Sequence, residues 1–136
     1  MADGDLQLHF APDTGELAAM RAKLGDWLTR RSAPAAVVDE LVLAADELCA
    51  NAIQAADGGQ VGLEARWDGT AVHLAVSNAG RAPDGFASAA TDPHAGTDVL
   101  RERGRGLTIV RAFTDSLAIV DVDGRTVARV VRLLPS

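Results

Sequence analysis

The 136-residue chain contains no tyrosine, a single cysteine and only three histidines. A lone cysteine excludes an intramolecular disulfide. Cys49 lies among apolar residues, where we expect a small buried side chain rather than a reactive thiol. The three histidines, His9, His73 and His94, lack the spacing of metal ligands. No order or spacing of residues suggests a Ser-His-Asp or Cys-His catalytic set, so nucleophilic catalysis of that kind is not predicted.

The chain also lacks long apolar runs and an excess of basic residues. No run approaches the roughly 20 apolar residues of a membrane-spanning helix, and the acidic N-terminus does not have the pattern of a secretory signal. The formal net charge of −6 gives no electrostatic reason to expect nucleic acid or an anionic membrane as a partner. We therefore expect a cytoplasmic protein. The charge leaves open a basic partner protein, or an anion held by a local site together with a metal ion.

Length and composition fit one globular domain. A chain of 136 residues is long enough for one compact domain and short for two. The apolar fraction of 48% and the charged fraction of 24% are typical of globular proteins. We expect residues 1–136 to form a single domain.

Strand-like and helix-like patterns succeed one another along the chain. Apolar and polar residues alternate over Leu6–Phe10 and in two hairpins, whose turns we place at Asp68-Gly69 and Asp123-Gly124. Helical spacing runs over residues 14–31 and 37–56. These elements predict an α+β fold, a two-layer α/β sandwich in which one mostly antiparallel sheet carries its helices on one face.

The second of these helices carries a polar pair. We expect Ser32 to be its N-cap, with Pro34 in the first turn. Its apolar stripe comprises Val38, Leu41, Ala45, Leu48, Ala52 and Ala56, and we place Glu40, Glu47, Asn51 and Gln54 on the opposite side. Glu47 and Asn51 are one turn apart, so their polar ends point into the same space. Such a pair can hold a hydrated divalent cation and orient a reacting hydroxyl or water. The alternative is the solvated acidic face of a surface helix.

A long segment without a periodic pattern separates the two hairpins. Residues 80–103 contain three glycines and two prolines, which predicts a lid or a mobile segment, with a disordered insertion as the alternative. Before this lid, a strand ends in Asn78-Ala79-Gly80. After it comes Gly104-Arg105-Gly106-Leu107, where glycines open a helix whose first N–H groups can face an anion.

This order of motifs resembles the ATP-binding domain shared by gyrase-type ATPases, the Hsp90 chaperone, histidine kinases and MutL proteins. Within that superfamily the chain is most similar to the small bacterial anti-sigma-factor serine/threonine protein kinases. Their pattern is Glu-Leu-x-x-Asn-Ala, then Asp-x-Gly, then Gly-x-Gly-Leu, and the resemblance extends from about Leu6 to Leu133.

The resemblance implies an ATP-dependent kinase that uses Mg²⁺. Asn51 matches the asparagine that binds the metal, and Glu47 matches the glutamate proposed as general base for a seryl or threonyl hydroxyl. The positions that match nucleotide-binding motifs are Asn78, Gly80, Gly104, Arg105, Gly106 and Leu107. The resemblance further implies two protein partners, a sigma factor and an anti-sigma antagonist protein, and suggests a homodimer.

One motif departs from the family pattern. Asn78 stands where the family has an aspartate that accepts a hydrogen bond from the adenine amino group, and Ala82 replaces a further glycine. An asparagine carries both an acceptor and a donor, so it can turn either one toward a base. This predicts weaker ATP binding and less discrimination against GTP. A second function therefore stays open: a catalytically degenerate regulator of the same fold that acts by protein contact, with weak or no nucleotide binding.

Overall fold

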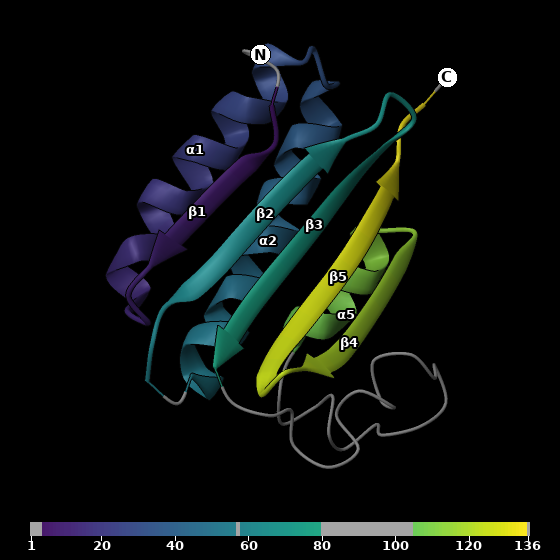
Figure 1. Cartoon of the computed structure of the whole chain (residues 1–136). Helices are drawn as coiled ribbons and strands as arrows, with labels where there is room; N and C mark the ends of the chain where they lie inside the picture. Colours follow the sequence, from purple (N-terminus) through teal and green to yellow (C-terminus); the bar gives the residue numbers. More distant parts are fainter. Residues whose placement is uncertain (1–3, 57, 80–104, 136) are drawn as a thin grey trace.

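A computed structural model describes residues 4–56, 58–79 and 105–135 of the chain. Five strands form one open sheet in the order β1-β2-β3-β5-β4, and every neighbouring pair is antiparallel (Figure 1). The strands are β1 Leu6–Phe10, β2 Val61–Trp67, β3 Ala71–Ala79, β4 Ser116–Val122 and β5 Arg125–Leu133. Both predicted hairpins are confirmed, with β2–β3 and β4–β5 as their arms.

The helices cover one face of this sheet (Figure 1). A short 3-10 turn, Thr14–Glu16, leads into α1, Leu17–Arg30; then come α2, Ala35–Ala55, and α5, Arg105–Phe113. The predicted α+β class and two-layer arrangement are confirmed. Within the described residues, no helix is long and apolar enough to cross a membrane.

The core lies between the helices and the sheet. The residues that form it can be deduced from the spacing of apolar residues in each helix and strand. Alternate residues of β2 and β3 point toward the helices, and the apolar stripes of α1 and α2 meet them. The largest fully buried side chains include Leu24, Leu28, Leu41, Val61, Leu63, Val72, Leu74 and Val130. Each such side chain contributes about 1.5–3 kcal/mol through removal of apolar surface from water.

The connection between α1 and α2 corrects one prediction. Ser32 is not the N-cap of α2; the N-cap is Pro34, which makes no side-chain capping bond. Ser32 instead has a left-handed backbone, with φ of 63°, and its N–H bonds to the carbonyl of Thr29. Because Ala33 also bonds back to Leu28, Ser32 belongs to the turn that closes α1.

The position of the polar residues on α2 also corrects the sequence interpretation. Ala44 lies one turn from both Glu40 and Glu47 and is fully buried. The arc of Glu40, Glu47 and Asn51 therefore lies beside the buried stripe rather than opposite it. Glu40, Glu47 and Asn51 are partly buried and Gln54 is exposed, so the predicted arc runs along the border of the buried stripe. The exposed side of α2 is formed instead by residues such as Asp39 and Leu43.

Candidate functional site

The antiparallel topology brings distant parts of the chain to one end of the molecule. In Figure 1 the second half of α2, the end of β3 and the start of α5 all lie at the lower end. The glycines that follow α2 reach the same place, because a side-chain carbon at Gly59 would lie 3.8 Å from Cβ of Ala79. β4 ends and β5 begins at this end as well, since β5 runs antiparallel to both of its neighbours.

A row of polar side chains crosses the helix-covered face of the sheet at this end. Asn78 of β3 pairs in register with Thr126 of β5, which pairs in turn with Asp121 of β4. Within the described residues, Asn78 and Thr126 are the only buried polar side chains, with 4% and 8% of their surface exposed. Burial of polar groups is unfavourable unless they are hydrogen-bonded, so two as direct neighbours indicate a built site. We call Asn78, Thr126 and Asp121 the polar row.

Two hydrogen bonds orient the groups of the polar row. The amide nitrogen Nδ2 of Asn78 donates to the backbone carbonyl of Ala79, at 2.9 Å. The hydroxyl of Thr126 donates to Oδ1 of Asp121, at 3.3 Å. The first bond fixes the orientation of the Asn78 carboxamide, which the sequence alone leaves open.

Thr126 and Asp121 were missed by the sequence analysis. Thr126 follows the period of β5, in which Ala128 and Val130 face the core, so its inward orientation could be deduced from the alternation. Its position beside Asn78 could not, because that depends on the register between two strands that are far apart in sequence.

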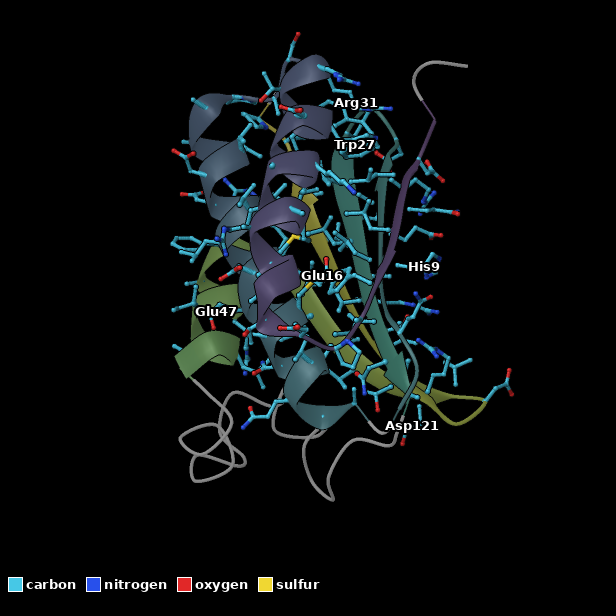
Figure 2. The ribbon with its side chains drawn as sticks, turned by 90° about the vertical axis from the view of Figure 1, so that its left-hand side faces the viewer. His9, Glu16, Trp27, Arg31, Glu47 and Asp121 are labelled. Carbon is cyan, nitrogen blue, oxygen red and sulfur yellow. The ribbon has the colours of Figure 1, made fainter. Side chains whose placement is uncertain are left out.

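The predicted pair on α2 lies in the helix layer. Glu47 and Asn51 are both partly buried, and Figure 2 shows Glu47 on the helix side of the molecule, with Asp121 at the lower end of the sheet. The Asn51 amide nitrogen has almost no surface exposed to solvent and no hydrogen-bond partner among the described residues. A buried amide in this state costs roughly 1–3 kcal/mol relative to a bonded one, which a structural role alone does not explain.

The glycine-rich motif is described only in part. α5 begins at Arg105, the second residue of the motif, and side chains are described from Leu107 onward. Leu107 and Val110 are fully buried and belong to the same core as α2, so they hold α5 in place. Gly80, Gly104 and the predicted lid, 80–103, lie outside the described residues.

The other end of α5 is anchored by Arg132 of β5. Its guanidinium donates to the carbonyl of Phe113, at 2.7 Å, and pairs with Glu40 of α2, at 2.6 Å. Thr114 closes the helix by donating to the carbonyl of Val110. Arg132 therefore links α5, α2 and the sheet, and Glu40 serves this contact rather than the site end of α2.

Comparison with known proteins assigns the fold to a family. The family model of the histidine kinase-like ATPase domain matches residues 10–132, nearly the whole chain. The chain belongs to this family. A comparison with curated proteins found no match.

Two solved structures share the fold of this ATPase domain. One contains the RsbU and RsbW domains of Rv1364c from Mycobacterium tuberculosis, with a TM-score of 0.72 and 19% identity. The match covers 98% of this chain but 33% of that one, so the chain spans about a third of its length. The other is a chain of the SiaB–SiaC complex from Pseudomonas aeruginosa, with a TM-score of 0.69 and 16% identity, covering 95% of this chain and 89% of that one.

Membership of the ATPase family implies ATP, usually with Mg²⁺, and the described residues fit such a ligand. Asn51 offers a carboxamide whose nitrogen no described group engages, and Glu47 lies one turn away. The described residues contain no group of three or more His, Cys, Asp or Glu side chains able to hold a metal ion by themselves. Mg²⁺ in nucleotide sites commonly binds through one or two protein ligands and keeps waters and substrate phosphates for the rest.

Proposed function

We propose that this histidine kinase-like ATPase domain is an anti-sigma-factor regulator with protein serine/threonine kinase activity. It would transfer the γ-phosphoryl group of ATP to a hydroxyl of an anti-sigma antagonist protein, and bind a sigma factor when it is not bound to that antagonist. Support comes from the order of the motifs and from the family. The observation that carries the proposal is the buried amide nitrogen of Asn51, which has no hydrogen-bond partner among the described residues and lies one turn from Glu47.

Each group has a role that its chemistry supports. Asn51, turned to present its oxygen, would hold Mg²⁺, which neutralises phosphate charge during phosphoryl transfer. The N-terminus of α5 would receive the phosphates, because its free N–H groups and helix dipole favour negative charge. Arg105, at the first position of α5, would add a positive charge there.

Glu47 would act as general base. Its partly buried carboxylate shares a helix face with Asn51, so it can accept the proton of a hydroxyl brought to the γ-phosphate. At the other side of the nucleotide, Asn78, Gly80, Gly104, Gly106 and the backbone of Leu107 would contact the base and the phosphates.

The proposal extends to partners and location. One of the two similar structures is a complex of two proteins, SiaB and SiaC, which supports binding of a protein partner by this fold. We propose that residues 1–136 act as a single domain in the cytoplasm, with segment 80–103 as a lid over the nucleotide, and that the protein forms a homodimer as related kinases do.

The test is phosphoryl transfer by wild type and Glu47→Gln. Purified protein is incubated with γ-labelled ATP, Mg²⁺ and each anti-sigma antagonist protein of the same organism, and label on the antagonist is measured in a single turnover. Wild type should label one antagonist on serine or threonine. Glu47→Gln should bind ATP with nearly unchanged affinity and transfer label at least ~100-fold more slowly. Equal transfer by both proteins would exclude Glu47 as the base, and no transfer by wild type would contradict the kinase.

A further inference from the structure

We infer that the uncovered face of the sheet carries a binding site for a small carboxylic acid, in which Arg125 holds the ionised acid group. The site lies across the sheet from the candidate functional site. The inference does not rest on the proposed kinase, because none of the residues that form this second site is a proposed contact of ATP or Mg²⁺.

Gly62 of β2 forms the floor of this site. It pairs in register with His9 of β1 on one side and with Ser77 of β3 on the other. A side-chain carbon at Gly62 would lie 3.0 Å from the hydroxyl oxygen of Ser77 and 3.5 Å from Nδ1 of His9. The imidazole, which Figure 2 shows on the side away from the helices, and the hydroxyl therefore flank the glycine. Because Gly62 has no side chain, the space between them stays open.

Arg125, the first residue of β5, supplies the positive charge. Its Nη2 donates to the carbonyl of Gln60, at 3.2 Å, and to the hydroxyl oxygen of Ser77, at 3.3 Å. These bonds use one nitrogen of the guanidinium, so its other N–H groups have no partner among the described residues. Within the described part of the chain, no ion pair joins Arg125 to a carboxylate. A partly buried guanidinium that is held in place without a counter-ion indicates a group positioned to bind an anion.

Ser77 and His9 add two neutral donors. The Ser77 hydroxyl accepts a bond from Arg125, which leaves its own proton to donate. The His9 ring carries at least one N–H in either tautomer, and no described group bonds to its ring nitrogens. Together with the guanidinium, these groups surround the space over Gly62 with donors, which is the arrangement that binds a carboxylate.

Charge and size define the class of ligand. Glu64 and Asp123 also line this groove, so the local charge opposes a doubly charged phosphate more strongly than a singly charged carboxylate. The groove has a volume of about 360 Å³, near the lower end of the range for ligand pockets. Val122, which pairs in register with Arg125, and Val127 give it an apolar side. These features fit an acid with a short, branched apolar chain.

The experiment is an NMR titration of the whole ¹⁵N-labelled protein with 3-methylbutanoate. Acetate and the neutral 3-methylbutanamide are the comparison ligands, at equal ionic strength, and the backbone amide signals of Gly62, Ser77 and Val127 report binding. Wild type should bind 3-methylbutanoate with a dissociation constant on the order of 1–10 mM, as expected for so small a ligand. Acetate should bind several-fold more weakly because it lacks the apolar chain. The amide should bind at least ~10-fold more weakly because it lacks the charge.

Two variants on different strands test the residues of the site. Arg125→Gln should weaken binding of 3-methylbutanoate at least ~10-fold, and Gly62→Ala should weaken it by filling the floor. Circular dichroism checks that each variant folds, and either variant tests the inference if the other does not fold. Arg129→Gln is the matched control, since Arg129 is exposed on the same strand and face but does not line the groove. It should bind the acid as wild type does, and so should Asn51→Ala.

Three results would each overturn the inference. The first is the absence of a saturable shift in wild type, the second is equal binding of the acid and the amide, and the third is unchanged binding in a folded Arg125→Gln. Loss of binding in Asn51→Ala would also contradict it, because that result would place the acid on the helix-covered side of the sheet.

Discussion

At the scale of single residues, the candidate site contains buried polar groups that do not contribute to the stability of the fold. Asn78 and Thr126 occupy positions where the alternation of their strands calls for apolar side chains, and Asn51 holds a buried amide nitrogen without a partner among the described residues. Such groups lower stability and are retained where they serve a ligand. Cys49 shows the opposite behaviour: burial, with a smaller effect of Asp46, raises the pKa of its thiol to about 12. This burial and the raised pKa agree with the prediction that Cys49 is a small buried side chain rather than a reactive thiol.

Replacement of Asn51 tests its role directly. We expect Asn51→Ala to abolish the Mg²⁺-dependent part of nucleotide binding without lowering the unfolding free energy of the ligand-free protein, since the amide nitrogen has no bond to a described group to lose and its burial is itself unfavourable. Calorimetric titration with ATP, with and without Mg²⁺, measures nucleotide binding. Urea unfolding measures the free energy of unfolding. The matched control is Gln54→Ala, an exposed residue of the same helix. Unchanged Mg²⁺ dependence in Asn51→Ala would remove the metal-ligand assignment.

At the scale of elements, side-chain contacts lock the ends of helices and turns. Arg132 connects α5 to α2 and the sheet, and Asp68 organises the β2–β3 turn by accepting bonds from the N–H groups of Thr70 and Ala71. The same carboxylate also contacts the His73 ring, at 2.8 Å. These contacts hold the two elements whose opposite ends reach the candidate site, β3 and α5.

Loss of the Arg132 contacts should loosen α5. We expect Arg132→Met to lower the unfolding free energy by about 1–3 kcal/mol, because Glu40 and the Phe113 carbonyl lose a charged partner in a partly buried position. Urea unfolding measures this. Arg129→Met serves as control, since Arg129 lies on the same strand but is exposed on the uncovered face of the sheet. Equal destabilisation by both variants would show that Arg132 has no special role in anchoring the helix.

The Asp68 turn should respond to acid. Its bonds, first of all that to His73 and then those to Thr70 and Ala71, hold the pKa of Asp68 well below its ordinary value. A carboxyl whose pKa is lowered in the folded state adds stability above its unfolded pKa, about 3.9, and that stability is lost as pH falls through the folded value. We expect the urea midpoint of wild type to drop below about pH 4 more steeply than that of Asp68→Asn. If the urea midpoints of the two proteins fall with pH in parallel, Asp68 does not contribute pH-dependent stability.

The elements were predictable because each has a clear local period, whereas details that depend on tertiary contacts were not. Alternation located β2, β3, β4 and β5, and helical spacing located α1 and α2. Ser32 was misassigned because the same residue suits the start of one helix and the turn that ends another. The partly buried state of Glu47 and Asn51 could not be predicted, because it depends on how the other elements pack against α2. Thr126 likewise became a site residue only through its register with Asn78.

At the scale of the whole molecule, helices cover one face of the sheet and leave the other open. The open face has a shallow groove of about 360 Å³ that includes His9, Ser77 and Arg125, and Figure 2 shows His9 on the side of the sheet away from the helices. Three of the four large apolar residues that the described chain exposes lie on the sheet: Val120, Val122 and Leu133. The polar row, by contrast, faces the helix layer, so the candidate site and the open face are separated by the sheet.

We propose that Mg·ATP binds at the end of the molecule where α2 and β3 finish and α5 begins. Thermal unfolding with and without Mg·ATP tests it most directly. A ligand that binds only the folded state adds about 2.7 kcal/mol at ~100 times its Kd, which for this size raises Tm by on the order of 5–10 °C. We predict such a rise for wild type, growing with ATP concentration, and a rise in Asn51→Ala that is smaller and independent of Mg²⁺. An unchanged Tm for wild type at millimolar Mg·ATP would contradict the account and leave a domain that regulates by protein contact alone.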